Sequence, residues 1–231
     1  MTTREDKLAA SVGASVSFSA DVRSSLTAQF LMAAAMQARA AAEIESRDVD
    51  AVTEDQKVSH GGLVVAAIMQ AVAGLECEIW EVVAYGPGHH LGSNGIDTGA
   101  RNLLAPLSEM IDGEPVLDRY RLVLHLLNKA PLDPGAQPWQ DAALVVRLRN
   151  ELVHYKSRWG EELERFKMLR AIQDKRHPKP PFVRASNFFP YQCLSAACAS
   201  WAAQVCVAFL DAFYRNLGFA GRLDPYRTRL G

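Results

Sequence analysis

The sequence predicts an all-α protein, and three observations carry that prediction. Apolar residues recur at spacings of three and four over several long stretches, which is the pattern of amphipathic helices. No stretch sustains the alternation of apolar and polar residues that a half-buried strand requires. Glycine and proline clusters separate the helical stretches. We therefore expect a bundle of five to seven helices packed around one hydrophobic core.

Length and composition are those of an ordinary globular chain. The 231 residues, 49% hydrophobic and 22% charged, suffice for one large domain. We expect this domain at 21–217, after a loosely packed arm at 1–20 and before a tail at 218–231. The first residues have no signal-peptide character, and the four cysteines lie in helical stretches, as reduced core residues do. These observations favour a cytoplasmic protein.

Two helices are expected in the first third of the chain. An alanine-rich stretch from about 24 to 45 has high intrinsic helix propensity. Thr53 followed by two acidic residues is a helix start, and the second helix should run to about Tyr85. The pair Gly61-Gly62 is a possible interruption, and Gly86-Pro87-Gly88 is the expected end.

The remaining helices follow a glycine-rich loop. They are expected at about 100–111, 116–128, 138–160, 161–175 and 191–217. In the third of these, Tyr155 is expected to face the core. Residues 185–210 carry no charge, so a membrane span must be considered. Several polar residues and many alanines make that stretch too polar for an easy span, so we expect a buried helix and no membrane.

The most informative short pattern is Arg149-Asn150 followed by His154, late in the helix expected at 138–160. Asn150 and His154 are four residues apart and share a helix face. Arg149 projects roughly 140° away from His154, but its side chain is long enough to reach a shared ligand. A fixed cation, an amide and a titratable imidazole form a plausible phosphate-handling group.

This pattern resembles the Arg-x(4–6)-His signature of HEPN domains, in the form with asparagine after the arginine. The resemblance extends more weakly over about 58–217. It implies an all-helical homodimer that cleaves RNA without metal or cofactor, as toxins and antiviral-defence proteins of this family do. Arg149, Asn150 and His154 would be the catalytic residues, and two copies would meet over one phosphodiester. The product would be a 2′,3′-cyclic phosphate.

The resemblance also bears on Tyr155 and Lys156, which directly follow the histidine and are candidate substrate-binding residues. Many HEPN toxins with an antitoxin carry His-x-Tyr, whose tyrosine the partner modifies. Lys156 occupies that tyrosine position here, which argues against such regulation, although an antitoxin or a defence partner remains possible. Lys156 would instead extend the phosphate contact, or it is a solvated lysine at a helix end.

Two alternatives to RNA cleavage stay open. The same cleft could bind RNA, nucleotide or a partner protein without catalysis, or the motif could be accidental in a helical interaction protein. The net charge of −1 does not indicate nucleic-acid binding, but residues 1–146 carry −9 and residues 147–231 carry +8. The basic half could bind RNA, or the two halves could neutralise each other within the fold.

Other candidate site residues are weaker. Arg119 and His125 also fit the spacing, but they lack the asparagine and lie in a packing pattern. His60, His89 and His90 have no acidic partner at ligand spacing, so we expect no metal site there. Three carboxylates of the long second helix could face the motif and hold Arg149, or they could as easily lie in solvent; they are Glu76, Glu78 and Glu81.

Overall fold

The chain folds as an all-α bundle in the computed structural model, which describes residues 25–91, 97–156, 167–219 and 221–230. This confirms the predicted all-α bundle, but the described residues form nine α-helices rather than the five to seven expected. The stretch expected as one helix at about 100–111 is divided by a 3₁₀ turn at Ala105–Leu107, and a further short helix forms near the C-terminal end. Five of the described helices exceed ten residues: α1 (Thr27–Glu45), α2 (Glu54–Tyr85), α5 (Val116–Leu126), α6 (Trp139–Val153) and α9 (Ala196–Leu217). Four are short: α3 (Thr98–Leu104), α4 (Ser108–Asp112), α8 (Lys167–Gln173) and α10 (Arg227–Leu230).

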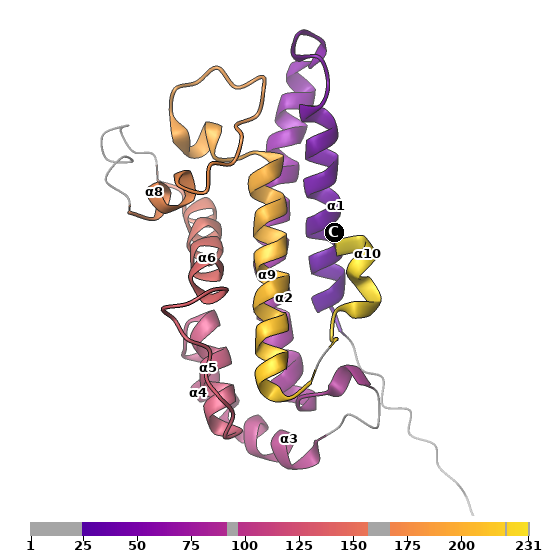
Figure 1. The fold of residues 1–231 in the computed structure, drawn as a ribbon, viewed down its shortest axis with the longest axis vertical. Helices are drawn as coiled ribbons and strands as arrows, with labels where there is room; N and C mark the ends of the chain where they lie inside the picture. Colours follow the sequence, from indigo (N-terminus) through magenta and orange to yellow (C-terminus); the bar gives the residue numbers. More distant parts are fainter. Residues whose placement is uncertain (1–24, 92–96, 157–166, 220, 231) are drawn as a thin grey trace, which may run out of the picture.

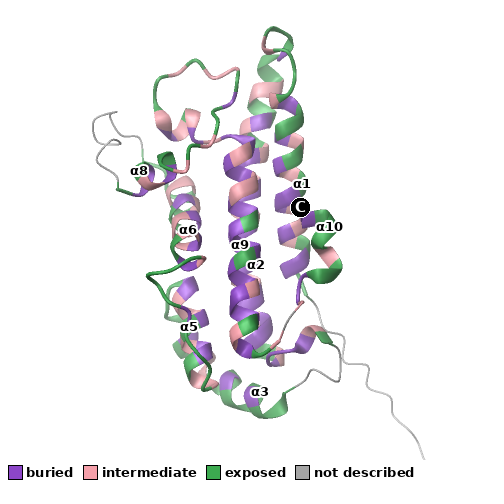
Figure 2. Ribbon diagram, viewed as in Figure 1, coloured by how far each residue is buried: buried purple, intermediate pink, exposed green. Residues whose placement is uncertain are grey.

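The three longest helices form the centre of the bundle. Helix α1 packs along α2, and α9 lies against both of them (Figure 1). Helices α5 and α6 cover the other side of α2 and α9, while α10 packs on α1. Buried residues line the inward faces of these helices (Figure 2). Because the core includes residues from Leu31 to Leu230, residues near the C-terminal end of the chain pack into the same core as α1.

Helix α2 begins and ends where the sequence predicts. Thr53 accepts a hydrogen bond from the backbone N–H of Gln56, whose side chain accepts one from the N–H of Thr53. This reciprocal capping box satisfies two N–H groups that the helix itself cannot pair. The helix continues through Gly61-Gly62 and stops at Gly86, which has a φ of +83°. A left-handed φ favours glycine, so the chain can turn here.

Helix α9 starts later than the sequence analysis expects. Its first residue is Ala196, and the Ser195 hydroxyl accepts from the N–H of Cys198. The stretch before it, Phe188–Gln192, is a single wide turn with a non-helical Phe189. Ser195 has an extended backbone, with φ −114° and ψ 162°, so α9 cannot extend continuously back to Tyr191. The predicted end holds, with Gly218 left-handed at a φ of +91°.

Aromatic rings pack at the centre of the core around Tyr120, whose hydroxyl forms a buried hydrogen bond. The Tyr120 ring packs edge-on against Phe209 and Phe213, with ring centroids 5.0 and 4.7 Å apart. Its hydroxyl donates to the carbonyl oxygen of Leu75 at 2.6 Å, so no polar atom of this buried side chain is left unpaired. As expected, the cysteines are free, and three of them are buried, namely Cys193, Cys198 and Cys206.

Helices α2 and α9 are long and apolar enough to cross a membrane by length and composition. In their most apolar windows, 50% and 67% of the residues are buried inside the bundle. Core helices of soluble proteins pass the same test, so it does not decide where the protein resides. The cytoplasmic location stays a prediction.

Candidate functional site

The motif lies at the C-terminal end of α6, where the helix ends earlier than predicted. Helix α6 stops at Val153, and His154 is its C-cap, with its backbone N–H donating to the carbonyl of Asn150 at 2.9 Å. Gly160, the expected end, lies outside the described residues. The side chains of Asn150 and His154 are exposed to solvent. The imidazole therefore stands at a helix terminus, open to a ligand.

Arg149 faces the opposite way, into the bundle. Its side chain is 22% exposed, and its Nη2 donates to the Glu76 carboxylate of α2 in an ion pair. Its Nε is buried and, within the described residues, has no hydrogen-bond partner. The prediction that an acid of the second helix holds Arg149 is therefore confirmed for Glu76. It is wrong for Glu78 and Glu81, whose carboxylates pair with Arg222 instead.

The residues after His154 are exposed, and Tyr155 does not face the core as expected. Its side chain is 47% exposed, and its ring lies 6.1 Å from that of Phe189. Lys156 is also exposed. Helix α6 ends at Val153, two residues before Tyr155. The helical periodicity that would have turned Tyr155 toward the core therefore does not reach this residue. Val153 and Tyr191 add further exposed apolar surface to these two segments.

One chain does not bring the three motif side chains together. Among the described residues, no side-chain hydrogen bond or ion pair joins any two of Arg149, Asn150 and His154. Arg149 points toward α2, whereas His154 lies beyond the end of α6. The divergence follows from their five-residue spacing on a helix. A shared ligand would require Arg149 to leave Glu76, or a second copy to supply the missing group.

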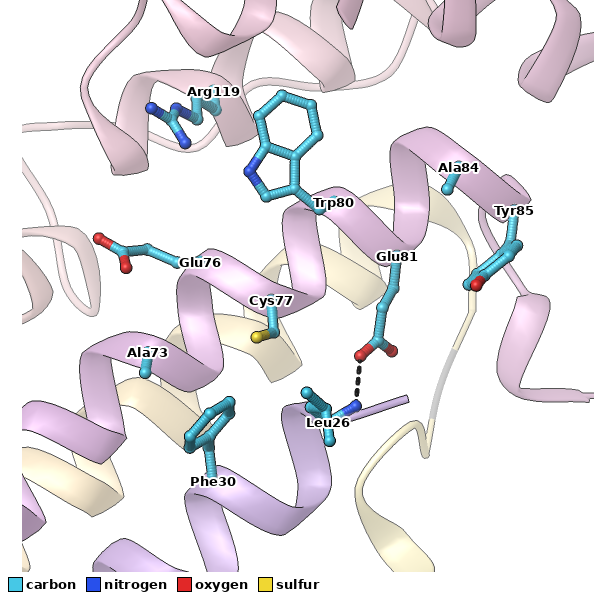
Figure 3. Close-up of a pocket in the computed structure, with 10 residues that line it drawn as sticks. All are labelled: Leu26, Phe30, Ala73, Glu76, Cys77, Trp80, Glu81, Ala84, Tyr85 and Arg119. Carbon is cyan, nitrogen blue, oxygen red and sulfur yellow. Dashed lines mark hydrogen bonds between the residues drawn. The ribbon is translucent and has the colours of Figure 1, made fainter. Parts of the chain in front are cut away.

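Glu76 also lines a groove of about 700 Å³ between α1, α2 and α5. In Figure 3, Trp80 and Arg119 lie together on one side of α2, and Phe30 lies across from them on α1. The Arg119 guanidinium sits 5.5 Å from the centre of the Trp80 ring. This arginine belongs to the alternative motif pair, but its donors are engaged by Asp112 and by the carbonyl of Glu114. The groove is thus mostly apolar, with charged groups at its edge.

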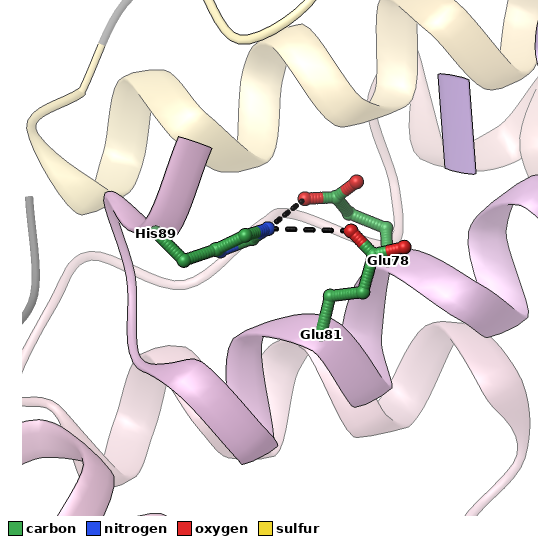
Figure 4. A group of neighbouring side chains, drawn as sticks. All are labelled: Glu78, Glu81 and His89. Atoms are coloured by element: carbon green, nitrogen blue, oxygen red, sulfur yellow. Dashed lines mark hydrogen bonds and ion pairs between the residues drawn. The ribbon is translucent and has the colours of Figure 1, made fainter. Parts of the chain in front are cut away.

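A buried polar cluster lies near one end of α2, and sequence reasoning missed it. The His89 Nε2 lies 3.3 Å from Glu81 Oε2 and 3.6 Å from Glu78 Oε1 (Figure 4). Arg222, from the C-terminal segment, is 3.2 Å from each of the same two oxygens. The expectation that His89 lacks acidic partners is therefore wrong. Gly86 turns the chain back on itself, which brings His89 beside the carboxylates eight and eleven residues earlier.

Glu81 is the best anchored member of this cluster. Burial alone would raise its pKa, but hydrogen bonds from His89, Ser25 and two backbone N–H groups lower that pKa to about 2. The donors at the start of α1 are the Ser25 hydroxyl at 2.8 Å and the N–H of Leu26 at 2.9 Å. The Thr27 hydroxyl and Arg222 also donate to this carboxylate, and all these hydrogen bonds favour its ionised form. This residue thereby joins the start of α1, the end of α2 and the C-terminal segment.

The other histidines considered from the sequence have structural surroundings. His60 lies 2.8 Å from Glu45, which also accepts from the first N–H of α9. His90 packs edge-on against Tyr214, and burial, with the nearby positive charge of Arg222, lowers the pKa of His90 to about 4. His125, the other half of the alternative motif, is exposed on α5. None of these three repeats the arrangement around His89.

Ion pairs within the fold neutralise part of the charge difference between residues 1–146 and residues 147–231. Basic residues of the second half pair with acids of the first half in the Arg149–Glu76, Lys175–Asp141 and Arg222–Glu81 contacts. Neutralisation across the two halves therefore occurs, as one of the two interpretations of the sequence expects. Lys156 and Arg147 remain exposed on or beside the motif helix.

Comparisons of the chain with protein-family models, with curated proteins and with solved structures found no match.

Proposed function

We propose that the protein is a HEPN-like endoribonuclease that cleaves RNA without metal, using Arg149, Asn150 and His154 of two copies of the chain. The observation that carries the proposal is the exposed His154 at the end of α6, one turn after Asn150 and Arg149. An imidazole in that position can reach a phosphodiester lying across the helix end. The proposal rests on the Arg-Asn-x-x-x-His pattern together with this exposure.

The chemistry assigns a different role to each side chain. Cleavage requires removal of the 2′-OH proton, stabilisation of charge on the phosphorane, and protonation of the 5′-oxygen that leaves. His154 would transfer protons, because imidazole can accept and donate near neutral pH. Arg149 would hold phosphate oxygens as a permanently charged fork. Asn150 would orient the phosphate or the imidazole, while Tyr155 and Lys156 would contact the substrate next to the cleaved bond.

One chain supplies a single imidazole, whereas the reaction uses a base and an acid. A second copy related by two-fold symmetry would bring another His154 and Arg149 to the same cleft. Exposed apolar side chains beside the motif favour such a contact, because isolated chains seldom leave several large apolar residues together in water. They are Val153, Tyr155 and Tyr191, which are 49%, 47% and 57% exposed.

A specific observation favours a second candidate, a module that binds RNA or nucleotide without cleaving it. The Arg149 guanidinium is engaged by Glu76 inside its own chain, so it is turned away from the exposed imidazole. If that pair persists when RNA binds, phosphate would be contacted by exposed residues such as Lys156, and the charge that catalysis needs would be missing.

The experiment compares cleavage of mixed RNA by the native chain, His154→Ala and His125→Ala in EDTA. His125 is the matched control, since it is an exposed helical histidine outside the motif. We expect cleavage by the native chain and by His125→Ala, cyclic-phosphate ends on the products, and a loss of at least about 100-fold in His154→Ala. Equal cleavage by all three proteins would refute the assignment of His154, and RNA binding without cleavage would support the second candidate.

A further inference from the structure

We propose that Glu78, Glu81 and His89 form a binding site for one first-row divalent metal ion, with Zn²⁺ and Mn²⁺ as the fitting chemistries. The three ligand atoms all lie within 4.8 Å of one another, and all three residues are buried (Figure 4). Imidazole nitrogen and carboxylate oxygen together suit these ions. The site is separate from the RNA-cleaving residues and does not depend on the function proposed for them.

The distances within the cluster match those between the ligands of one metal ion. The His89 Nε2 lies 3.3 Å from Glu81 Oε2 and 3.6 Å from Glu78 Oε1. A charge-assisted N–H···O bond is usually about 2.7–2.9 Å long. Metal–ligand bonds of about 2.0–2.2 Å in a tetrahedron give edges of about 3.3–3.6 Å. Both measured separations fall within that range of edges.

The orientation of His89 is that of a metal ligand held by an outer partner. Its Nδ1 lies 3.2 Å from the carbonyl oxygen of Gly86, which can only accept, so Nδ1 carries a hydrogen. When Nε2 gives up its hydrogen to bind a metal ion, its lone pair faces the two carboxylates. Metal-binding histidines commonly donate their other N–H to a backbone carbonyl in this way. A metal ion between Nε2 and the oxygens would take the place of the hydrogen that Nε2 donates to Glu81.

The two carboxylates are also fixed from outside the cluster. Glu81 accepts from the Ser25 hydroxyl and from backbone N–H groups at the start of α1. Glu78 Oε1 accepts from the buried hydroxyl of Tyr214. The side chain of Glu78 is fully buried, yet within the described residues its Oε2 has no hydrogen-bond partner. An ionised carboxylate with one unpartnered oxygen is costly in a protein interior, and a metal ion bound at Oε1 would offset part of that cost.

Arg222 competes with a metal ion for the two carboxylates. Its guanidinium lies 3.2 Å from one oxygen of each carboxylate, so it supplies one of the two positive charges that Glu78 and Glu81 require. A histidine that binds a metal ion is neutral, so in the metal-bound form Arg222 leaves one negative charge without a counter-charge. A divalent ion with a hydroxide as fourth ligand would restore neutrality. Glu81 also lines the open groove between α1, α2 and α5, so the cluster lies beside a space that is open to solvent (Figure 3).

The test is metal binding by the full native chain after EDTA treatment and removal of the chelator. Equilibrium dialysis should give one Zn²⁺ or Mn²⁺ per chain, whereas Mg²⁺, which prefers six oxygens, should not bind. At 100-fold excess over its dissociation constant, the ion should raise Tm by about 5–10 °C. His89→Ala should lose both effects, and the exposed control His125→Ala should keep them.

Cobalt gives a second measurement that does not depend on any variant folding. Co²⁺ bound by the native chain should show the visible absorption of a four-coordinate site, and Zn²⁺ should displace it. No stoichiometric ion on the native chain, or an ion retained fully by a folded His89→Ala variant, would overturn the proposal. RNA cleavage is assayed in EDTA below the Tm of the metal-free chain, so the chain is folded whether or not it binds metal. The cleavage result and the metal-binding result can therefore fail independently of each other.

Discussion

Glu81 predicts how the stability of this protein depends on acid. The pKa of its carboxyl is about 2 in the folded chain against an ordinary 4.5. The ionised form is therefore stabilised by folding, and this contribution is fully present above pH 4.5 and is lost as the pH falls toward 2. A difference of about 2.5 pKa units corresponds to about 3 kcal/mol. Because the side chain is only 8% exposed, solvent screening removes little of that figure.

Urea unfolding of the native chain and of Glu81→Gln, measured in EDTA from pH 7 to pH 2, checks this value. The native chain should lose about 3 kcal/mol more unfolding free energy than the variant over that range. The variant itself should be less stable at pH 7, since an amide cannot accept the same charged hydrogen bonds. Glu43→Gln is the matched control, because Glu43 is exposed on α1. If Glu81→Gln and the native chain lost the same unfolding free energy over this pH range, folding would not lower the pKa of Glu81. That result would refute the role given to its hydrogen bonds.

Two further substitutions, the second with a matched control, test the ion pair of the motif and the packing of the core. Glu76→Gln should lower the free energy of unfolding by about 1 kcal/mol, because it removes a partly exposed ion pair. It should also increase RNA affinity by freeing Arg149, so weaker RNA binding would contradict the role given to Glu76. A Cβ at Gly74 would lie 2.9 Å from Leu31, so Gly74→Ala should destabilise the α1–α2 contact by about 1–3 kcal/mol. Gly61→Ala, with open space around it, should be neutral or slightly stabilising in the same chemical denaturation experiment.

The helices and most of their ends follow from the sequence by itself. The apolar stripes of α1, α2 and α9, the capping box at Thr53 and the stops at Gly86 and Gly218 are all local signals. Each depends on residues within about one helical turn, so no knowledge of the fold is needed to recognise it. The Arg149 and His154 pattern is local in the same sense. Its proposed use in RNA cleavage is a prediction that awaits the experiment described above.

The positions of the polar side chains depend on tertiary structure. Sequence reasoning placed Tyr155 in the core and left His89 without acidic partners, and both expectations were wrong. It could not have placed Arg222 beside Glu81, because 141 residues separate them along the chain. The C-terminal segment reaches α2 only when the whole bundle packs. Burial of charge is favourable only where opposite charges and hydrogen-bond donors converge, and that convergence is a property of the assembled fold rather than of any local stretch.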